Sequence, residues 1–176
     1  MSKSKARRAR AKQLEKRNNE ILRRNTFLNF ASVEKMQKKP IDGLTKRYIL
    51  RAESGKIIDS PATFYNAVSN ASFPMDPPNG ELWDGLADSL FGGFLTPKFK
   101  YNYVNVFWLN ANDSAAASPT FFINTVKWFS QVAVSVSATK EDEPFHEENG
   151  VVLRLFLICS NEESAEELRD ELNLPY

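Results

Sequence analysis

The segment Gly80-Glu81-Leu82-Trp83-Asp84-Gly85-Leu86-Ala87-Asp88-Ser89-Leu90-Phe91 decides how the rest of the chain is interpreted. As an α-helix, it aligns leucines spaced four residues apart on one apolar face. Its acidic residues Glu81, Asp84 and Asp88 fall on a different face. Residues 57–97 contain no Lys or Arg, so these carboxylates have no cation nearby in the sequence. The segment predicts a helix whose acidic face is either a binding surface or an ordinary solvated surface.

Length and composition indicate one soluble globular domain with an appendage. The chain has 176 residues, 42% hydrophobic and 26% charged, which is typical of a protein with a buried core. The sequence has no apolar run of the roughly 18 residues that span a bilayer. Its basic N-terminus lacks the apolar segment of a signal peptide. The single cysteine, Cys159, excludes an internal disulfide and favours a reducing compartment. A cytoplasmic protein is therefore expected.

The net charge of +1 hides a strong division along the chain. Residues 1–40 contain 13 Lys and Arg against 3 Asp and Glu, a net charge of +10. Residues 41–176 contain 10 Lys and Arg against 19 Asp and Glu, a net charge of −9. We therefore expect a basic arm, residues 1–40, joined to an acidic domain, residues 41–176. Such an asymmetry indicates interactions rather than a particular fold.

The basic arm has apolar residues at seven-residue spacing, Leu14, Ile21 and Leu28. This spacing predicts a modest amphipathic helix over residues 13–30. Clustered Lys and Arg suit nucleic-acid phosphates or an acidic protein partner, because the contact releases counterions. A solvated tail, or a helix that docks on the acidic domain of the same chain, explains the same residues. These alternatives stay open.

The remaining sequence alternates between strand-like and helix-like segments. Aromatic and β-branched residues predict strands over 47–51, 101–109 and 151–159. Strands separated by helices, two of them apolar on both faces, predict a small parallel sheet covered by helices.

Two Ser-Pro pairs predict helix starts, because serine caps a helix and proline suits its first position. Ser60-Pro61 opens a helix to about residue 71, and Ser118-Pro119 opens a longer one. Residues 132–136 alternate like a strand, but we interpret them as a continuation of that longer helix. Residues 110–118 are expected to form a loop. Ser160 and Glu163 have the spacing of a capping box, which predicts a final helix.

The residues that catalysis requires are scarce. His146 lies in an acidic loop and Cys159 in an apolar strand, so a nucleophile–base pair is not expected. The sequence has no glycine-rich phosphate loop and no Cys/His metal spacing. Glu81, Asp84 and Asp88 suit a carboxylate-bound Mg²⁺ ion as one alternative. We expect a protein that is not an enzyme and that holds no cofactor or metal.

The segment Gly80 to Leu90 resembles the signature helix of the barstar-like ribonuclease inhibitors. That signature runs roughly Gly-x-Asn-(Leu/Trp)-Asp-Ala-Leu-x-Asp-x-Leu. The order of predicted elements around it agrees, so the resemblance covers about residues 46–159. It implies an α/β fold with a small three-stranded parallel sheet flanked by helices. The basic arm and the helix after Cys159 lie outside the resemblance.

The resemblance also implies a function, which is the blocking of a basic ribonuclease. By position, Asp88 matches the acidic residue that occupies the phosphate-binding pocket, and Asp84 matches the one a turn earlier. The expected partner is an extracellular-type ribonuclease or a ribonuclease toxin, and the chain would be its immunity protein. An RNA- or ribosome-associated protein acting through the basic arm is the alternative. The full set of expected partner-binding residues is Pro78, Asn79, Glu81, Asp84, Ala87, Asp88 and Gln131.

This chain departs from the family pattern at several positions. Leu82 replaces the usual Asn, and Gly85 replaces the usual Ala, which weakens a helix by roughly 1 kcal/mol. Pro78, Asn79 and Ala87 stand where the family has aromatic contact residues. We therefore expect a target other than barnase.

Overall fold

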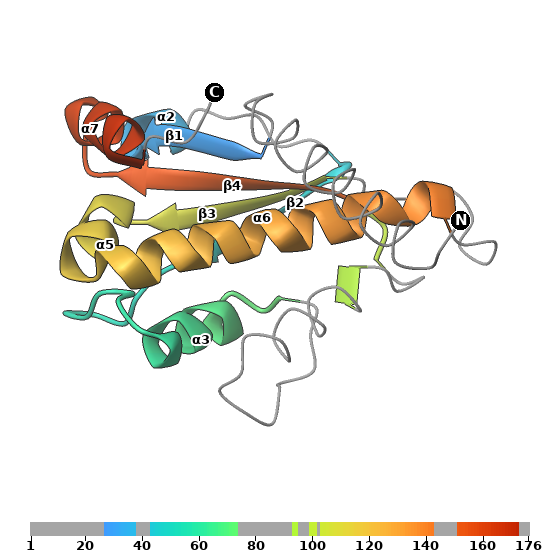
Figure 1. The fold of residues 1–176 in the computed structure, drawn as a ribbon, viewed down its shortest axis with the longest axis horizontal. Coiled ribbons are helices and arrows are strands. Elements are labelled where there is room, and N and C mark those ends of the chain that lie inside the picture. The colour runs from blue at the N-terminus through green and yellow to red at the C-terminus, as the bar shows by residue number, and fades with distance from the viewer. Residues whose placement is uncertain are drawn as a thin grey trace, which may run out of the picture.

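In the computed structural model, four parallel strands form one central sheet (Figure 1). The structure describes residues 27–37, 43–73, 93–94, 99–101, 103–142 and 151–172. The strands lie in the order β1-β4-β3-β2, so the last strand in the sequence occupies the middle of the sheet. Their bounds are Leu28–Ser32 for β1, Thr45–Leu50 for β2, Tyr103–Leu109 for β3 and Val152–Cys159 for β4.

Helices flank the sheet, which confirms the predicted α/β class and the parallel arrangement of the strands. The long helix α6 runs across the front of the sheet in Figure 1. The bounds are Val33–Gln37 for α2, Pro61–Asn70 for α3, Ala111–Ala117 for α5, Pro119–Asp142 for α6 and Glu162–Leu172 for α7.

The prediction of three strands is wrong, because β1 adds a fourth. Its residues pair with β4 from Leu28↔Leu155 to Ser32↔Cys159. The helix predicted over residues 13–30 is therefore wrong from residue 27 onward, and its residues 13–26 lie outside the described part. Leu28 fits the seven-residue spacing of the arm, but it belongs to a strand. Without β1, β4 would be an edge strand with unpaired backbone groups. β1 pairs with these groups, and the spacing of apolar residues could not reveal a partner so distant in the sequence.

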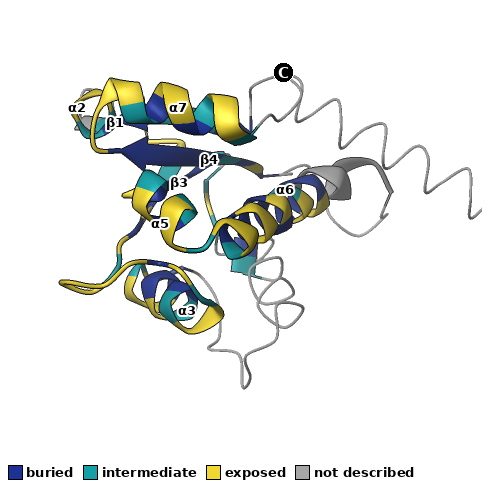
Figure 2. Cartoon of the chain, turned by 60° about the vertical axis from the view of Figure 1, so that its left-hand side comes forward, coloured by how far each residue is buried: buried dark blue, intermediate teal, exposed yellow. Residues whose placement is uncertain are grey.

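The two faces of the sheet are packed differently. The larger core joins β2, β3 and β4 to α3, α6 and α7, and Trp108 and Leu155 lie fully buried within it. On the opposite face, Phe107 and Phe156 stack with ring centroids 4.8 Å apart, and α2 packs beside them. Because both faces are covered, β3 and β4 are almost continuously apolar. Figure 2 shows this burial along the strands and the inner sides of the helices.

Helix α3 begins as the sequence predicts. Ser60 is the N-cap, and its Oγ accepts from the Thr63 N–H at 3.4 Å. In return, the Ser60 N–H donates to Thr63 Oγ1 at 3.1 Å, and Pro61 opens the first turn. The buried face of α3 carries Phe64, Ala67 and Val68. Two of the orphan donors of the helix start are thereby satisfied.

The expected loop over residues 110–118 is wrong, because the structure has α5 there. Asn110 adopts a left-handed conformation with φ 55°, which redirects the chain directly after β3. The alanines that follow are strong helix formers. The buried Trp108 Nε1–H donates to Ser114 Oγ at 3.1 Å and fixes α5 to the end of β3.

The longer predicted helix is confirmed through residues 132–136, all of which lie in α6. Phe122, Val126, Phe129 and Ala133 follow one another at helical spacing and are buried. The alternating valines that resembled a strand are buried against the core as well, because the helix packs over a broad surface.

The final helix exists, but its predicted cap is displaced by one residue. Helix α7 starts at Glu162, and Asn161 Oδ1 accepts from the Ser164 N–H at 2.8 Å. The predicted Ser160–Glu163 capping box does not form. Leu168 is buried and Leu172 packs against the core.

Among the described helices, none is long and apolar enough to cross a membrane.

Substitution Ser114→Ala tests how strongly α5 is held. The change leaves the buried Trp108 indole N–H without an acceptor, which costs about 1–3 kcal/mol of unfolding free energy. Urea denaturation followed by circular dichroism measures this loss. Ser69→Ala, at an exposed position on α3, is the matched control and should change the unfolding free energy by no more than about 0.5 kcal/mol. An equal midpoint for the two variants would contradict the assigned role of this hydrogen bond.

Candidate protein-binding site

The predicted acidic helix lies outside the described residues, which stop at Phe73 and resume at Gly93. The structure therefore does not describe six of the predicted partner-binding residues: Pro78, Asn79, Glu81, Asp84, Ala87 and Asp88. It does describe both ends of the segment that contains them, and these ends limit how the acidic residues are presented.

Both ends of this segment are anchored at one place in the core. Phe73 is 6% exposed and Phe94 is 2% exposed, and their ring centroids lie 6.2 Å apart. Tyr48 of β2 stacks on Phe73 at 4.3 Å and contacts Phe94 at 6.2 Å. Phe99 extends the group, with its ring 5.3 Å from Phe94. We call these four residues the Tyr48 cluster. The chain leaves and re-enters the core there, so residues 74–93 start and finish beside the same edge strand.

A positive charge borders the Tyr48 cluster. Lys46 Nζ lies 5.5 Å from the ring centroid of Tyr48 and 5.7 Å from that of Tyr101. Burial, with a smaller effect of Tyr101, raises the pKa of Tyr48 well above its usual value. The Tyr48 hydroxyl therefore stays protonated at physiological pH. Tyr48 therefore adds no negative charge beside residues 74–93, whose negative charge comes from their own Asp and Glu residues.

Gln131, the remaining predicted contact residue, lies exposed on α6. Its neighbours Val132 and Ala133 are buried, so Gln131 occupies the outer side of the helix. This position is accessible to a partner. The described contacts do not join it to the Tyr48 cluster.

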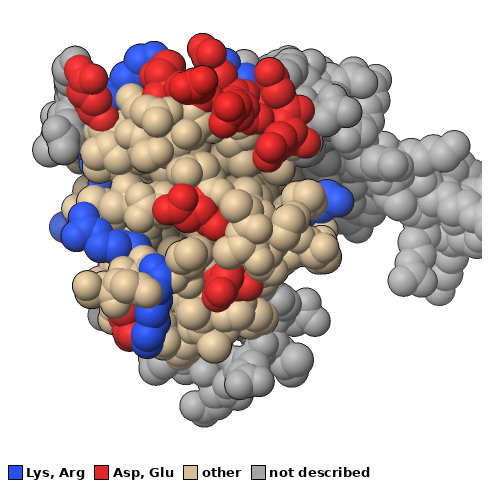
Figure 3. All heavy atoms as spheres, turned by 90° about the vertical axis from the view of Figure 1, so that its left-hand side faces the viewer, with Lys and Arg blue, Asp and Glu red and all other residues tan. Residues whose placement is uncertain are grey.

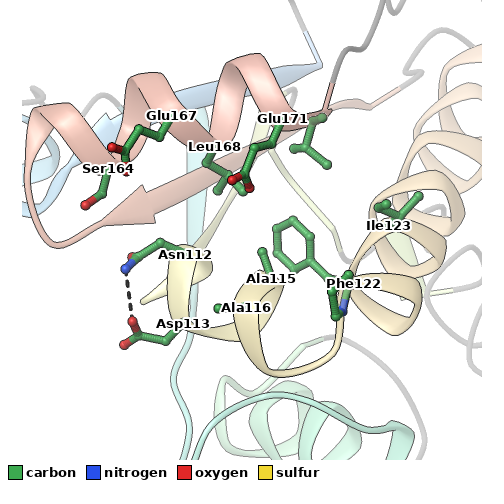
Figure 4. A pocket seen from close by; sticks show the side chains of 12 residues that line it. Asn112, Asp113, Ala115, Ala116, Phe122, Ile123, Ser164, Glu167, Leu168 and Glu171 are labelled. Atoms are coloured by element: carbon green, nitrogen blue, oxygen red, sulfur yellow. Dashed lines mark hydrogen bonds between the residues drawn. The ribbon is translucent and has the colours of Figure 1, made fainter.

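Sequence reasoning missed a second surface, a groove between α5, the start of α6 and α7. The groove holds about 540 Å³. Phe122 and Leu168 form its apolar floor, and Asn112 lies between Asp113 of α5 and the α7 residues Glu167 and Glu171 (Figure 4). The lining contains no Lys or Arg. We call this surface the α5–α7 groove.

The acidic character of the groove continues over α7. This helix has six acidic residues and one arginine among its eleven residues. Figure 3 shows acidic side chains gathered where α7 lies and another near the centre of the same face. The density of Glu in residues 162–171 was the available sequence signal. The facing wall could not be predicted, because residues 110–118 were expected to be a loop.

Cys159 is a core residue, as predicted. It is 0% exposed, and burial raises the pKa of its thiol to about 11. The thiol is therefore protonated at pH 8, and the thiolate is the reactive form. Within the described ranges, no group of three or more His, Cys, Asp and Glu is placed to hold a metal ion. His146 lies outside those ranges.

Comparisons with protein-family models, with curated proteins and with solved structures found no match for this chain. The fold defines it as an α/β protein with a four-stranded parallel sheet. The resemblance of residues 80–90 to the barstar-like inhibitors stays a prediction.

Thiol labelling tests the assignment of Cys159 to the core. We expect native protein at pH 8 to react with a disulfide reagent only as fast as it unfolds, and at once in 6 M guanidinium. Ser160→Cys adds a thiol at an exposed neighbouring position, and this second thiol should react within seconds. Equal rates for both thiols in the native protein would contradict the assignment.

Because the pKa of Cys159 is raised on folding, the thiol ionises at a lower pH in the unfolded chain than in the folded one. The free energy of unfolding should therefore fall as the pH rises from 9 toward 11.

Substitution Phe94→Ala tests the Tyr48 cluster. Removing a ring that is 2% exposed should cost about 3–5 kcal/mol of unfolding free energy, because a cavity remains beside Tyr48 and Phe73. Leu44→Ala, at a side chain 55% exposed, is the control and should cost far less. Urea titration measures both. A loss below about 1 kcal/mol for Phe94→Ala would show that the cluster does not anchor the segment.

Proposed function

We propose that this protein inhibits a basic ribonuclease by placing the acidic residues of segment 80–91 over the active site of the enzyme. One observation carries the proposal. The segment between Phe73 and Phe94 holds acidic residues and no Lys or Arg, and its two ends are joined through the Tyr48 cluster.

Anchoring both ends favours binding energetically. A segment fixed at two points loses less conformational entropy on binding than a free chain of the same length. The carboxylates on it then meet the partner without ordering a tail. This explains how a short acidic sequence serves as a binding element.

The chemistry of the target follows from the carboxylates. A ribonuclease active site binds phosphate through Arg, Lys and His, and Asp84 and Asp88 offer oxygens that accept the same charge-assisted hydrogen bonds. Arginine pairs with a carboxylate in a bidentate geometry. The negative charge of the domain steers a basic enzyme toward it. Asp88 is the proposed principal contact and Asp84 the second.

Specificity is proposed to come from the smaller neighbours. The positions near the acidic residues carry small side chains, Pro78, Asn79 and Ala87. The surface of the target that meets them should therefore protrude further than the surface of a ribonuclease whose inhibitor has aromatic residues at these positions. Glu81 and Gln131 complete the proposed contact set. We place the protein in the cytoplasm, where its single thiol stays reduced.

Variants Asp88→Asn and Asp84→Asn test this function. Each keeps the side-chain shape and removes one charge, so binding to the cognate basic ribonuclease should weaken by about 2–5 kcal/mol. Calorimetry and inhibition of RNA cleavage measure the change. Asp170→Asn, at an exposed position on α7 that does not line the α5–α7 groove, makes the same change elsewhere and should bind normally.

Unchanged binding in both Asp84 and Asp88 variants would refute the mechanism. Salt-dependent RNA binding without ribonuclease inhibition would instead support the alternative of an RNA-associated protein acting through the basic arm.

A further inference from the structure

The α5–α7 groove combines an apolar floor with an acidic rim. Phe122 and Leu168 are buried beneath the groove, and the apolar lining that an occupant can touch is Ile123, which is 37% exposed, with Pro119 and Leu172. The rim carboxylates of Asp113, Glu167 and Glu171 form no ion pair among the described residues, and the lining supplies no cation. An occupant that suits this surface has apolar side chains on one face and Lys or Arg on the other.

The wall at α5 also offers a hydrogen-bond acceptor. Asn112 Nδ2 donates to Asp113 Oδ1 at 2.9 Å. The Oδ1 atom of Asn112 is buried and accepts no hydrogen bond within the described part of the chain. A Lys or Arg N–H at this wall would pair with the exposed Asp113 carboxylate, whereas the buried Asn112 Oδ1 offers it no surface. The groove therefore favours a cationic donor in addition to apolar contact.

The sequence of this chain contains such a segment. Residues 1–26 carry 10 Lys and Arg against 2 Asp and Glu. Their apolar residues include Leu14, Ile21 and Leu22, which are large enough to contact the accessible lining residues Ile123 and Leu172. Charge and composition are thus complementary to the groove.

This segment starts from the opposite end of the parallel sheet from α5, because it precedes the amino end of β1 whereas α5 follows the carboxyl end of β3. It joins β1 at Phe27, and β1 packs directly against α7. The guanidinium carbon of Arg169 on α7 lies 5.5 Å from the ring centroid of Phe30 on β1. A chain of 26 residues spans roughly 39 Å as a helix, whereas a domain of this size has a radius of gyration of about 15 Å. The reach is therefore sufficient within one molecule.

We propose that the α5–α7 groove binds residues 1–26 of the same chain, and that lysines and arginines of this segment pair with the carboxylates of Asp113, Glu167 and Glu171. Covalent attachment gives the arm an effective concentration in the millimolar range, so weak contacts suffice. This inference does not depend on the proposed ribonuclease partner.

Carbodiimide cross-linking of the full chain at low protein concentration tests the docking. The reagent joins a lysine amine to a carboxylate only where the two are in contact. We expect mass spectrometry of the monomer band to find amide links from Lys3, Lys5, Lys12 or Lys16 to the three rim carboxylates. These links should disappear in 1 M NaCl, where the Debye length falls to about 3 Å.

Two double variants provide the matched comparison. Glu167→Lys with Glu171→Lys reverses the charge of the α7 wall, so the links to Asp113 should fall at least tenfold. Glu163→Lys with Glu166→Lys makes the same change at exposed α7 positions outside the lining and should leave those links intact. Circular dichroism checks that both variants fold.

Three outcomes would overturn the proposal. The first is an absence of arm links at low salt. The second is equal linking to Glu163 and Glu166, which would show contact with the acidic helix in general and not with the groove. The third is linking between molecules, detected by mixing isotope-labelled and unlabelled chains, which would assign the groove to a second copy.

Discussion

The parallel pairing of β3 with β4 is the constraint on which the rest of the structure depends. It runs from Tyr103↔Val152 to Leu109↔Ile158 and lies in the middle of the sheet. Its residues supply both cores, since Trp108 and Leu157 enter the larger one while Phe107 and Phe156 stack on the opposite face. Every described helix reaches this pair directly or through a neighbouring strand. A parallel pair needs a long crossover, and α5 and α6 form it.

The order of the strands separates the two candidate binding surfaces. The Tyr48 cluster is built on β2 at one edge of the sheet, and α7 packs over β1 and β4 toward the other edge. Three strand spacings, roughly 14 Å, lie between the edge strands. A partner bound at segment 74–93 therefore need not displace an occupant of the α5–α7 groove. Acidic residues thus occur at both candidate surfaces.

Much of the fold could be predicted from the sequence where local chemistry and tertiary packing agree. Ser60 and Pro61, with Thr63, define the start of α3 locally. The apolar runs of β3 and β4 reflect burial on both faces. The errors occurred where a distant partner decided the outcome. Leu28 fits a helical spacing but pairs with Leu155, and residues 110–118 look polar yet dock through Trp108 and Ser114. Of the predicted site, Gln131 is exposed, while the acidic residues lie in a segment of which only the ends are described. The α5–α7 groove could not be predicted, because its two walls, α5 and α7, lie far apart in the sequence and no local pattern brings them together.

The central position of β4 also governs how the chain can fold. β1 pairs with β4 across 127 residues of sequence, and among the described strands it has no other partner. During synthesis, β2 and β3 can pair first, but β1 cannot join the sheet until β4, which ends at residue 159, has been made. Sheets completed by their last strand have high contact order and form slowly. β1 is thus incorporated only after β4 has been made, and the basic segment that precedes β1 stays unattached to the sheet until then.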